Sequence, residues 1–255
     1  MEPASHVPLD EEPNPLVRKL EAIFDLTDGE RGALRRLPMA VRELGPHQDI
    51  VRDGDRPSHS CLVIDGLTFR YKLVGEDRRQ ILAFHIPGEI PDLQSLYLKR
   101  MDHSFATLTQ SRLGFIQHRA LFDLMEHCPR LAGALWRETL IDAAIFREWI
   151  VGLGCRKAPM RIAHFLCEMF ARLDAIGMAR DGTVRLPMTQ EEIGDSLGLS
   201  AVHVNRSLQE LRTQGLFTFE SGKLAVHDWE GLKRAGDFDP TYLHHRVRDA
   251  GEQEP

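Results

Sequence analysis

The chain has few cysteines and no long apolar run. Its 255 residues include four cysteines, Cys61, Cys128, Cys155 and Cys167, and no two of them form a Cys-x-x-Cys pair. This spacing disfavours a structural zinc site and an iron–sulfur cluster, which need closely placed thiolates. No uncharged stretch approaches the roughly 20 apolar residues of a membrane span, and the N-terminus lacks the pattern of a secretory signal. We therefore expect a cytoplasmic protein with reduced thiols, no metal and no membrane partner.

The composition is that of a globular protein with a slight excess of acidic residues. Hydrophobic residues make up 42% of the chain and charged residues 27%, which excludes a mostly disordered chain. The net charge of −6 weighs against general coating of nucleic acid. It still allows a local DNA-binding face, because phosphate contacts depend on where the cations lie. Residues 1–14 are rich in acids and proline and are predicted to form a flexible acidic tail.

Residues 15–126 have the pattern of short strands that follow one or two short helices. Between residues 45 and 88, glycines recur every 9 to 13 positions. Residues 67–73 alternate apolar and polar side chains, which is the period of a half-buried strand. Short strands separated by turn residues predict a compact antiparallel β-sandwich or β-roll.

Residues 127–156 are predicted to form a long helix with more than one apolar face. The four residues that we assign to dimerisation on this helix are Leu135, Ile141, Ile145 and Trp149. The β-domain of the same chain can cover one face, and the same helix of a second copy can cover the other. The alternative is a helix buried between two domains of a monomer. Gly154 and nearby breakers predict a hinge into the next unit.

Residues 157–231 contain the pattern of a helix-turn-helix. Thr189 and Glu192 have the spacing of a capping box, which stabilises a helix start by about 1 kcal/mol. Gly198 then allows a tight turn, and Ser200 can cap a second helix. Two alternating segments around residues 221–222 predict a β-hairpin, the wing of a winged helix.

The second helix is predicted to carry two different faces. Its inward stripe comprises Ala201, Val204, Leu208 and Leu211. Its outward, base-reading face comprises Val202, Asn205, Arg206 and Gln209. Arginine reads guanine bidentately, amides read adenine, and valine contacts the thymine methyl group. The groups predicted to contact phosphates are the helix starts at Thr189 and Ser200, and Lys223 near the tip of the wing.

Together these motifs make residues 16–230 resemble the Crp/Fnr family of bacterial transcription regulators. The segments that carry the resemblance are Ile86-Pro87-Gly88-Glu89, Arg161-Ile162-Ala163 and Thr189-Gln190-Glu191-Glu192-Ile193-Gly194. The family implies an α+β protein with an N-terminal jelly-roll-like sensor domain, a long dimerisation helix and a C-terminal winged helix-turn-helix. It implies double-stranded DNA, a second copy of the chain and RNA polymerase as partners.

The resemblance also implies roles for single residues. Gln190 joins Thr189 and Ser200 near phosphates, and Arg206 reads guanine. Val202 replaces the family's usual glutamate, so an acceptor for cytosine or adenine amino groups is absent and recognition of the usual half-sites is in doubt.

The sensor domain departs from members of the family that bind cyclic nucleotides. Alignment on Pro87-Gly88-Glu89 places Leu93 at the ribose-binding glutamate and His103-Ser104 at the phosphate-binding Arg-Ser pair. These positions form the predicted effector pocket. Without the carboxylate and the guanidinium the strongest contacts are lost, so we expect no cAMP binding in the family manner.

Histidine leaves haem open as a cofactor. His85 and His103 are the candidate axial ligands, although a structural role is the more common one for such residues. The cysteine-rich motif of iron–sulfur members is absent, so no such cluster is expected. His244 and His245 are predicted to lie at the surface in a C-terminal extension over residues 232–255.

An alternative interpretation is a ligand- or metal-binding, cupin-like roll whose helical C-terminal region contacts proteins. The histidines at 47, 59 and 85 lack the spacing of a facial metal triad. The chain has no Gly-x-Ser-x-Gly elbow and no phosphate-binding Gly-x-x-x-x-Gly-Lys loop, so we do not expect an enzyme. The regulator interpretation is therefore preferred.

Overall fold

The computed structural model describes residues 14–75 and 78–246, and the chain folds in the order that the sequence predicts. It starts with helices α1 (Pro15–Glu21) and α2 (Asp28–Arg35). Asn14 caps α1 because its side chain accepts the N–H groups of the first turn, so this residue belongs to the helix and not to the predicted tail. The rest of that tail lies outside the described residues.

Two antiparallel sheets follow and form the β-roll of the N-terminal domain. One sheet has the order β1-β7-β3 and the other β2-β6-β4-β5. The strands are β1 (Ala40–Leu44), β2 (Asp49–Val51), β3 (His59–Asp65), β4 (Thr68–Val74), β5 (Arg78–His85), β6 (Ser104–Thr107) and β7 (Ser111–Gln117). A short 3-10 helix, η1 (Leu93–Leu96), joins β5 to β6. The predicted alternating strand is β4, which pairs with β5 on one side and β6 on the other.

Gly88 in the loop after β5 allows α1 to lie directly on the roll. Its φ is +93°, a conformation that side chains rarely adopt. A Cβ atom at this position would collide with the carbonyl oxygen of Pro15 and the side chain of Lys19. The glycine of the Ile86–Glu89 segment therefore brings α1 and the roll into contact.

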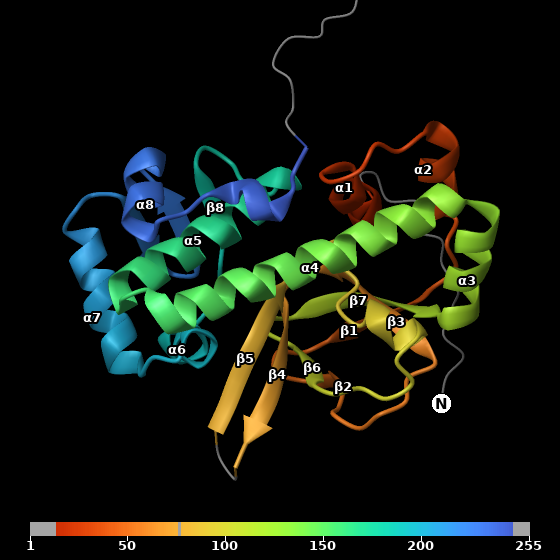
Figure 1. The fold of residues 1–255 in the computed structure, drawn as a ribbon, viewed down its shortest axis with the longest axis horizontal. Coiled ribbons are helices and arrows are strands. Elements are labelled where there is room, and N and C mark those ends of the chain that lie inside the picture. The colour runs from red at the N-terminus through yellow and green to blue at the C-terminus, as the bar shows by residue number, and fades with distance from the viewer. Residues whose placement is uncertain (1–13, 76–77, 247–255) are drawn as a thin grey trace, which may run out of the picture.

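A long helix runs across the whole molecule. After α3 (His118–His127), helix α4 (Pro129–Cys155) has the β-roll on one side, while α1, α2 and only part of the C-terminal domain lie on the other (Figure 1). Pro129 fits the first turn because an N–H at this position would have no acceptor within the helix, so its absence costs no hydrogen bond. The helix continues through Gly152 and Gly154, and the break lies at Arg156–Lys157, where the backbone is extended. This moves the predicted hinge two to three residues later.

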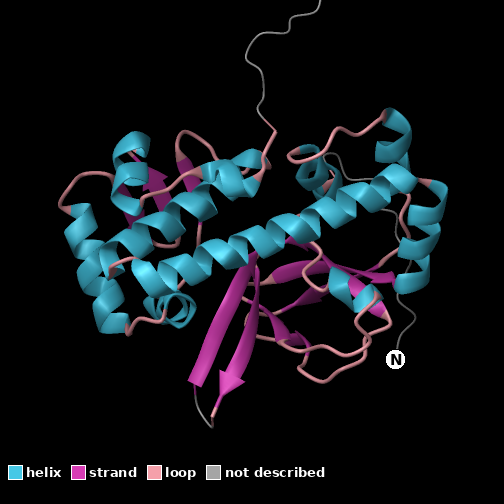
Figure 2. Cartoon of the chain, in the orientation of Figure 1, coloured by secondary structure: helices cyan, strands magenta, loops and turns pink. Residues whose placement is uncertain are grey.

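The C-terminal domain is a helix-turn-helix with a small three-stranded sheet, β8-β10-β9 (Figure 2). Its elements are α5 (Ala158–Ala175), β8 (Thr183–Arg185), α6 (Gln190–Leu197), α7 (Ala201–Arg212), β9 (Phe217–Glu220), β10 (Lys223–Val226) and α8 (Trp229–Gly236). Helix α8 packs on α5, so the domain extends beyond the predicted boundary at residue 231. The arrangement confirms the predicted α+β fold class.

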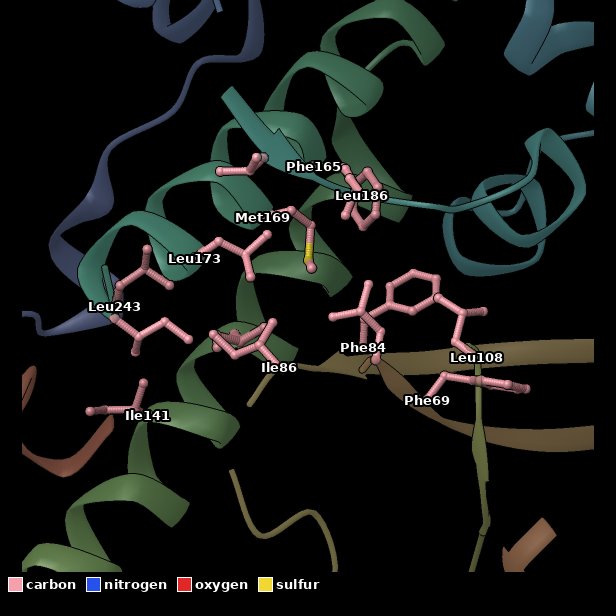
Figure 3. Packing of buried hydrophobic residues seen from close by; sticks show 14 of the residues in the cluster. Phe69, Phe84, Ile86, Leu108, Ile141, Phe165, Met169, Leu173, Leu186 and Leu243 are labelled. Carbon is pink, nitrogen blue, oxygen red and sulfur yellow. The ribbon is translucent and has the colours of Figure 1, made fainter. Parts of the chain in front are cut away.

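The two domains share one hydrophobic core. Figure 3 shows Phe84 of β5 beside Phe165 of α5, and their ring centroids lie 5.6 Å apart. The same cluster includes Met169 and Leu173 of α5 and Ile141 of α4. Because apolar side chains of both domains are buried together, the C-terminal domain packs closely against the roll.

Candidate nucleic-acid interface

The helix-turn-helix is built by local hydrogen bonds at three places. The N–H of Glu192 donates to the Thr189 hydroxyl at 3.2 Å, and the N–H of Thr189 donates to the Glu192 carboxylate at 2.7 Å. Gly198 ends α6 in the left-handed region with φ of 64°. The Ser200 hydroxyl then accepts the N–H of His203 at 3.3 Å and caps α7. These contacts orient α7 relative to α6.

Helix α7 presents a polar face to solvent. The exposed side chains on this face are Val202, Asn205, Arg206 and Gln209, all four of the predicted base-reading residues. Val202 is 77% exposed, so its side chain is free to contact a thymine methyl group. Glu210 is also exposed, but it lies in the last turn, away from the helix start that enters a DNA groove in helix-turn-helix proteins.

The inward face of α7 differs from the prediction at one position. Val204, Leu208 and Leu211 are buried as expected, but Ala201 is exposed. Ala201 opens the helix, and the core covers its inner face only from Val204 onward. Ser207 is buried beside Leu208 and completes the inner face.

The predicted phosphate-contacting groups lie at the two helix starts and on the wing. Thr189, Ser200 and Lys223 are exposed, and Gln190 is half-buried. Lys223 follows a turn in which both Ser221 and Gly222 have positive φ. Arg185 of β8 pairs in register with Lys223 of β10 and is also exposed. The sequence analysis missed Arg185 because only the strand register brings the two cations together.

Helix α6 is docked on the N-terminal domain. The Arg79 guanidinium at the start of β5 binds the Asp195 carboxylate at 2.8 Å. The Gln80 amide donates to the carbonyl oxygens of Asp195 at 2.7 Å and of Ser196 at 3.2 Å. These contacts fix the position of the helix-turn-helix while leaving the outer face of α7 open.

The four residues of α4 that were predicted to form a dimer interface are covered, wholly or in part, within the single chain. Leu135, Ile141 and Ile145 are buried by the chain itself, and the Trp149 indole donates to the buried Glu168 carboxylate at 3.1 Å. The apolar residues of α4 that remain exposed are Trp136, Leu140, Ile150, Val151 and Leu153. These five residues, which we call the uncovered face of α4, are the surface available to a partner.

A small cavity, partly open to solvent, lies between the roll and α4. Leu93 is the only one of the three predicted pocket residues in its lining. His103 instead contacts Asp102 at 2.7 Å, and the Ser104 hydroxyl accepts the N–H of Asp53. His103 also lies 3.3 Å from the amide of Gln94, which lines the cavity, so it is a neighbour of the lining and not part of it.

Besides Lys19 and Arg172, this cavity is lined by Arg70 of β4, to which no sequence motif points. Its guanidinium binds the Asp142 carboxylate of α4 at 2.5 Å and donates to the carbonyl oxygen of Pro91 at 2.9 Å. Asp142 follows the buried Ile141 on the face of α4 that packs on the roll. The cation is therefore already paired with an acid of the same chain.

The two candidate haem ligands lie in different surroundings. His85 is buried and lines the cavity, where its Nδ1 contacts Glu89 at 3.1 Å. Burial, together with the positive charge of Arg70, lowers the pKa of His85 to about 4. His103 lies outside the cavity lining, and burial likewise lowers its pKa. His85 therefore stays neutral at physiological pH.

Residues 14–75 and 78–246 contain no group of three or more His, Cys, Asp or Glu side chains placed to hold a metal ion. Within the same ranges, no helix has the length and hydropathy of a membrane span.

The fold and the exposed face of α7 define a winged-helix protein joined to a sensor-type β-roll, and comparison with known proteins agrees. A Crp-like helix-turn-helix domain matches residues 160–235, and a cyclic nucleotide-binding domain matches residues 41–128. The nitrogen fixation regulation protein FixK of Bradyrhizobium diazoefficiens is 31% identical over 168 residues, covering 65% of this chain and 69% of the relative.

Two further relatives are similar over most of the chain. The transcriptional activator protein FnrA of Stutzerimonas stutzeri is 27% identical over 191 residues, 75% of this chain and 78% of the relative. The solved structure of FixK2 from Bradyrhizobium japonicum has a TM-score of 0.70 and 26% identity, covering 77% of this chain and 96% of that one. The chain belongs to the Crp/Fnr family of transcriptional regulators. This supports the regulator over the cupin-like alternative.

Proposed function

We propose that the protein binds an inverted-repeat DNA site as a homodimer, with one α7 helix in each of two successive major grooves. The observation that carries this proposal is the exposed face of α7, flanked by the capped starts of α6 and α7. A recognition helix with Asn205 and Arg206 exposed can reach base edges, while Thr189, Gln190, Ser200 and Lys223 would contact phosphate oxygens. Two such helices in a dimer contact half-sites about 34 Å apart.

The uncovered face of α4 provides the surface for dimerisation. Trp136 and Ile150 are 65% and 68% exposed, and they lie 14 residues apart, which is two heptads. Two copies of this helix can bury the stripe against each other with coiled-coil spacing. Burial of large apolar side chains would supply the driving force.

The remaining partners follow from this role. We place the protein in the cytoplasm, where bacterial DNA and RNA polymerase are found, and propose a contact with RNA polymerase and no catalytic activity of its own. A small-molecule effector would bind the cavity that contains Leu93 and Arg70. We propose no iron–sulfur cluster; haem stays open, with the neutral imidazole of His85 as the candidate ligand.

Selection of binding sites from random duplex DNA tests the main proposal. The purified chain is expected to enrich an inverted repeat whose half-sites are centred about one helical turn apart, each with a guanine for Arg206. The same selection with an Asn205→Ala, Arg206→Ala double variant is the matched control, and it should enrich no half-site. The proposal would be contradicted if the unaltered chain enriched no sequence, or only sequences without an inverted repeat.

We further propose that cAMP does not act on this protein in the family manner. The Leu93 side chain cannot accept a ribose hydroxyl, and His103 lies outside the cavity. The cations that line the cavity are already paired, Arg70 with Asp142, and Lys19 and Arg172 with Glu89. Calorimetric titration is therefore expected to show no heat of binding at micromolar cAMP. A saturable signal that an Arg70→Ala variant loses would overturn this expectation.

A further inference from the structure

The chain does not leave the C-terminal domain after α8. Phe238 is buried, and the chain then forms a 3-10 helix, η2 (Pro240–Leu243), that lies against α4 and α5. It continues to the α1–α2 loop of the N-terminal domain, where the described residues end at Arg246. We call residues 240–246 the strap. Sequence analysis expected a surface extension here, but Leu243 is buried and only His244 of the two histidines is exposed.

The strap is attached to the C-terminal domain by an aromatic residue. The Tyr242 hydroxyl donates to the Glu168 carboxylate of α5 at 2.9 Å and lies 3.2 Å from His164 Nε2. The two rings are stacked, with 13° between their planes. Glu168 is fully buried, so loss of this hydrogen bond would leave part of a buried charge unsatisfied.

The other end of the strap is attached to the N-terminal domain. The Arg246 N–H donates to the Ala22 carbonyl oxygen at 2.7 Å, and its guanidinium lies 3.3 Å from Asp25. Between the two ends, Leu243 is 1% exposed and packs in the cluster that contains Leu173 of α5 and Ile141 of α4 (Figure 3). Seven residues therefore connect the two domains and α4.

The strap lies over a buried ionic cluster that joins the same elements. Glu89, in the loop after β5, binds Lys19 of α1 at 2.8 Å and Arg172 of α5 at 3.0 Å. Lys19 also binds Glu138 of α4 at 3.2 Å. Burial raises the pKa of a carboxyl group, but here Arg172 and Lys19 outweigh it and hold the pKa of Glu89 well below its usual range. Separation of the domains would break the ion pair between Arg172 and Glu89, the contact of this cluster that joins the two domains.

His245 of the strap is half-buried. Burial and the positive charges of Lys19 and Arg172 lower its pKa to about 4, although Glu89 acts in the opposite direction. The imidazole is therefore neutral at physiological pH and adds no third cation beside Lys19 and Arg172. The strap and the ionic cluster thus support the same arrangement of the two domains.

This arrangement leaves the reading surface open. Val202, Asn205 and Arg206 are exposed, so neither the strap nor the N-terminal domain covers the outer face of α7. A two-half-site operator requires both α7 helices of a dimer to reach successive grooves together. If each C-terminal domain moved freely on its own hinge, binding of both half-sites at once would cost orientational entropy. If the domains are fixed, this cost is avoided, and the second half-site contributes more fully to the affinity.

We propose that the strap fixes the orientation of the C-terminal domain on the N-terminal domain, and so sets the affinity for a full inverted repeat without changing how one half-site is read. The inference depends on the proposed function, because its readout is DNA binding. It predicts a specific separation of effects. Removal of the strap should weaken binding to two half-sites and leave binding to one half-site unaltered.

The test compares two shortened chains. One ends at Arg246 and keeps the strap; the other ends at Asp239 and loses it, but retains Phe238, which packs on His164. Each is titrated by fluorescence anisotropy with the selected full repeat, with a duplex that carries one half-site, and with random DNA. We expect the chain without the strap to lose about tenfold in affinity for the full repeat and to bind the half-site as the control does.

A point variant separates domain orientation from folding. Arg246→Glu changes only the end of the strap that contacts Ala22 and Asp25, at an exposed position. Arg234→Glu on α8 makes the same charge change at an exposed site away from the strap and is the matched control. We expect Arg246→Glu to reduce the preference for the full repeat over the half-site, and Arg234→Glu to leave that ratio unchanged.

Each other outcome has a definite meaning. Unchanged or increased affinity of the strapless chain for the full repeat would overturn the inference, since the strap would then be neutral or inhibitory. Equal loss on both duplexes would also overturn it, because the strap would then support folding of the C-terminal domain. Failure of the control chain to prefer either duplex over random DNA would instead refute the proposed function.

Discussion

Replacement of Arg206 by alanine is expected to remove most of the preference for the operator over random DNA. A guanidinium that binds guanine O6 and N7 together contributes about 1–3 kcal/mol of discrimination, which is about 5- to 150-fold for each half-site. Because a dimer reads two half-sites, the free energy of discrimination should be lost at both of them. The measurement is a competition titration of the variant against the selected operator and against an operator with both guanines replaced.

Arg234→Ala provides the matched control for this substitution. Arg234 is an exposed arginine of the same domain, but it lies on α8 and not on the recognition helix. Its removal should lower affinity for specific and random DNA by the same small factor, since only a non-specific charge is lost. If Arg206→Ala behaves like this control, Arg206 does not read a base.

A negative charge on the uncovered face of α4 is expected to dissociate the dimer. Ile150→Glu places a carboxylate where the two helices would bury apolar surface, so dimerisation would have to remove this charge from water. Sedimentation should show a monomer at concentrations where the unaltered chain is a dimer. Operator affinity should fall by at least about a hundredfold, because only one reading helix is then delivered to the site.

Ile145→Glu separates this effect from loss of folding. Ile145 was one of the four predicted interface residues, but it is 5% exposed within a single chain. A carboxylate there should destabilise the monomer by about 3 kcal/mol or more, seen as a lower midpoint of thermal unfolding. A dimeric, normally stable Ile150→Glu protein would show that the uncovered face does not form the interface.

The helix-turn-helix could be predicted because its signals are local. Thr189 and Glu192 lie three residues apart, so their reciprocal hydrogen bonds depend on almost nothing distant in the chain. The same holds for the positive φ values at Gly198 and at the 221–222 turn. The error at Ala201 arose at the first residue of a helix, where periodicity shows the side that a residue faces but not whether the core extends that far.

The dimer-forming residues could not be predicted because apolar character does not identify the surface that covers it. Leu135, Ile141 and Trp136 are all apolar residues of one helix, yet only Trp136 remains exposed. Which face is covered depends on how the roll, α1 and the strap pack around α4. Similarly, the alignment that pointed to His103 followed a family pattern, whereas Arg70 enters the cavity from a strand earlier in the chain.

The residues of this chain alone determined the order of its domains, the reading helix with its caps, and the wing, since each depends on neighbours within a few positions. Only the tertiary structure decided which face of α4 stays open, that Arg70 is neutralised by Asp142, and that Lys19, Glu89 and Arg172 meet beneath the strap. The partners in that cluster lie 70 and 83 residues apart. Long-range ion pairs of this kind leave no periodic pattern in a sequence, because they form only where separately folded elements are packed together.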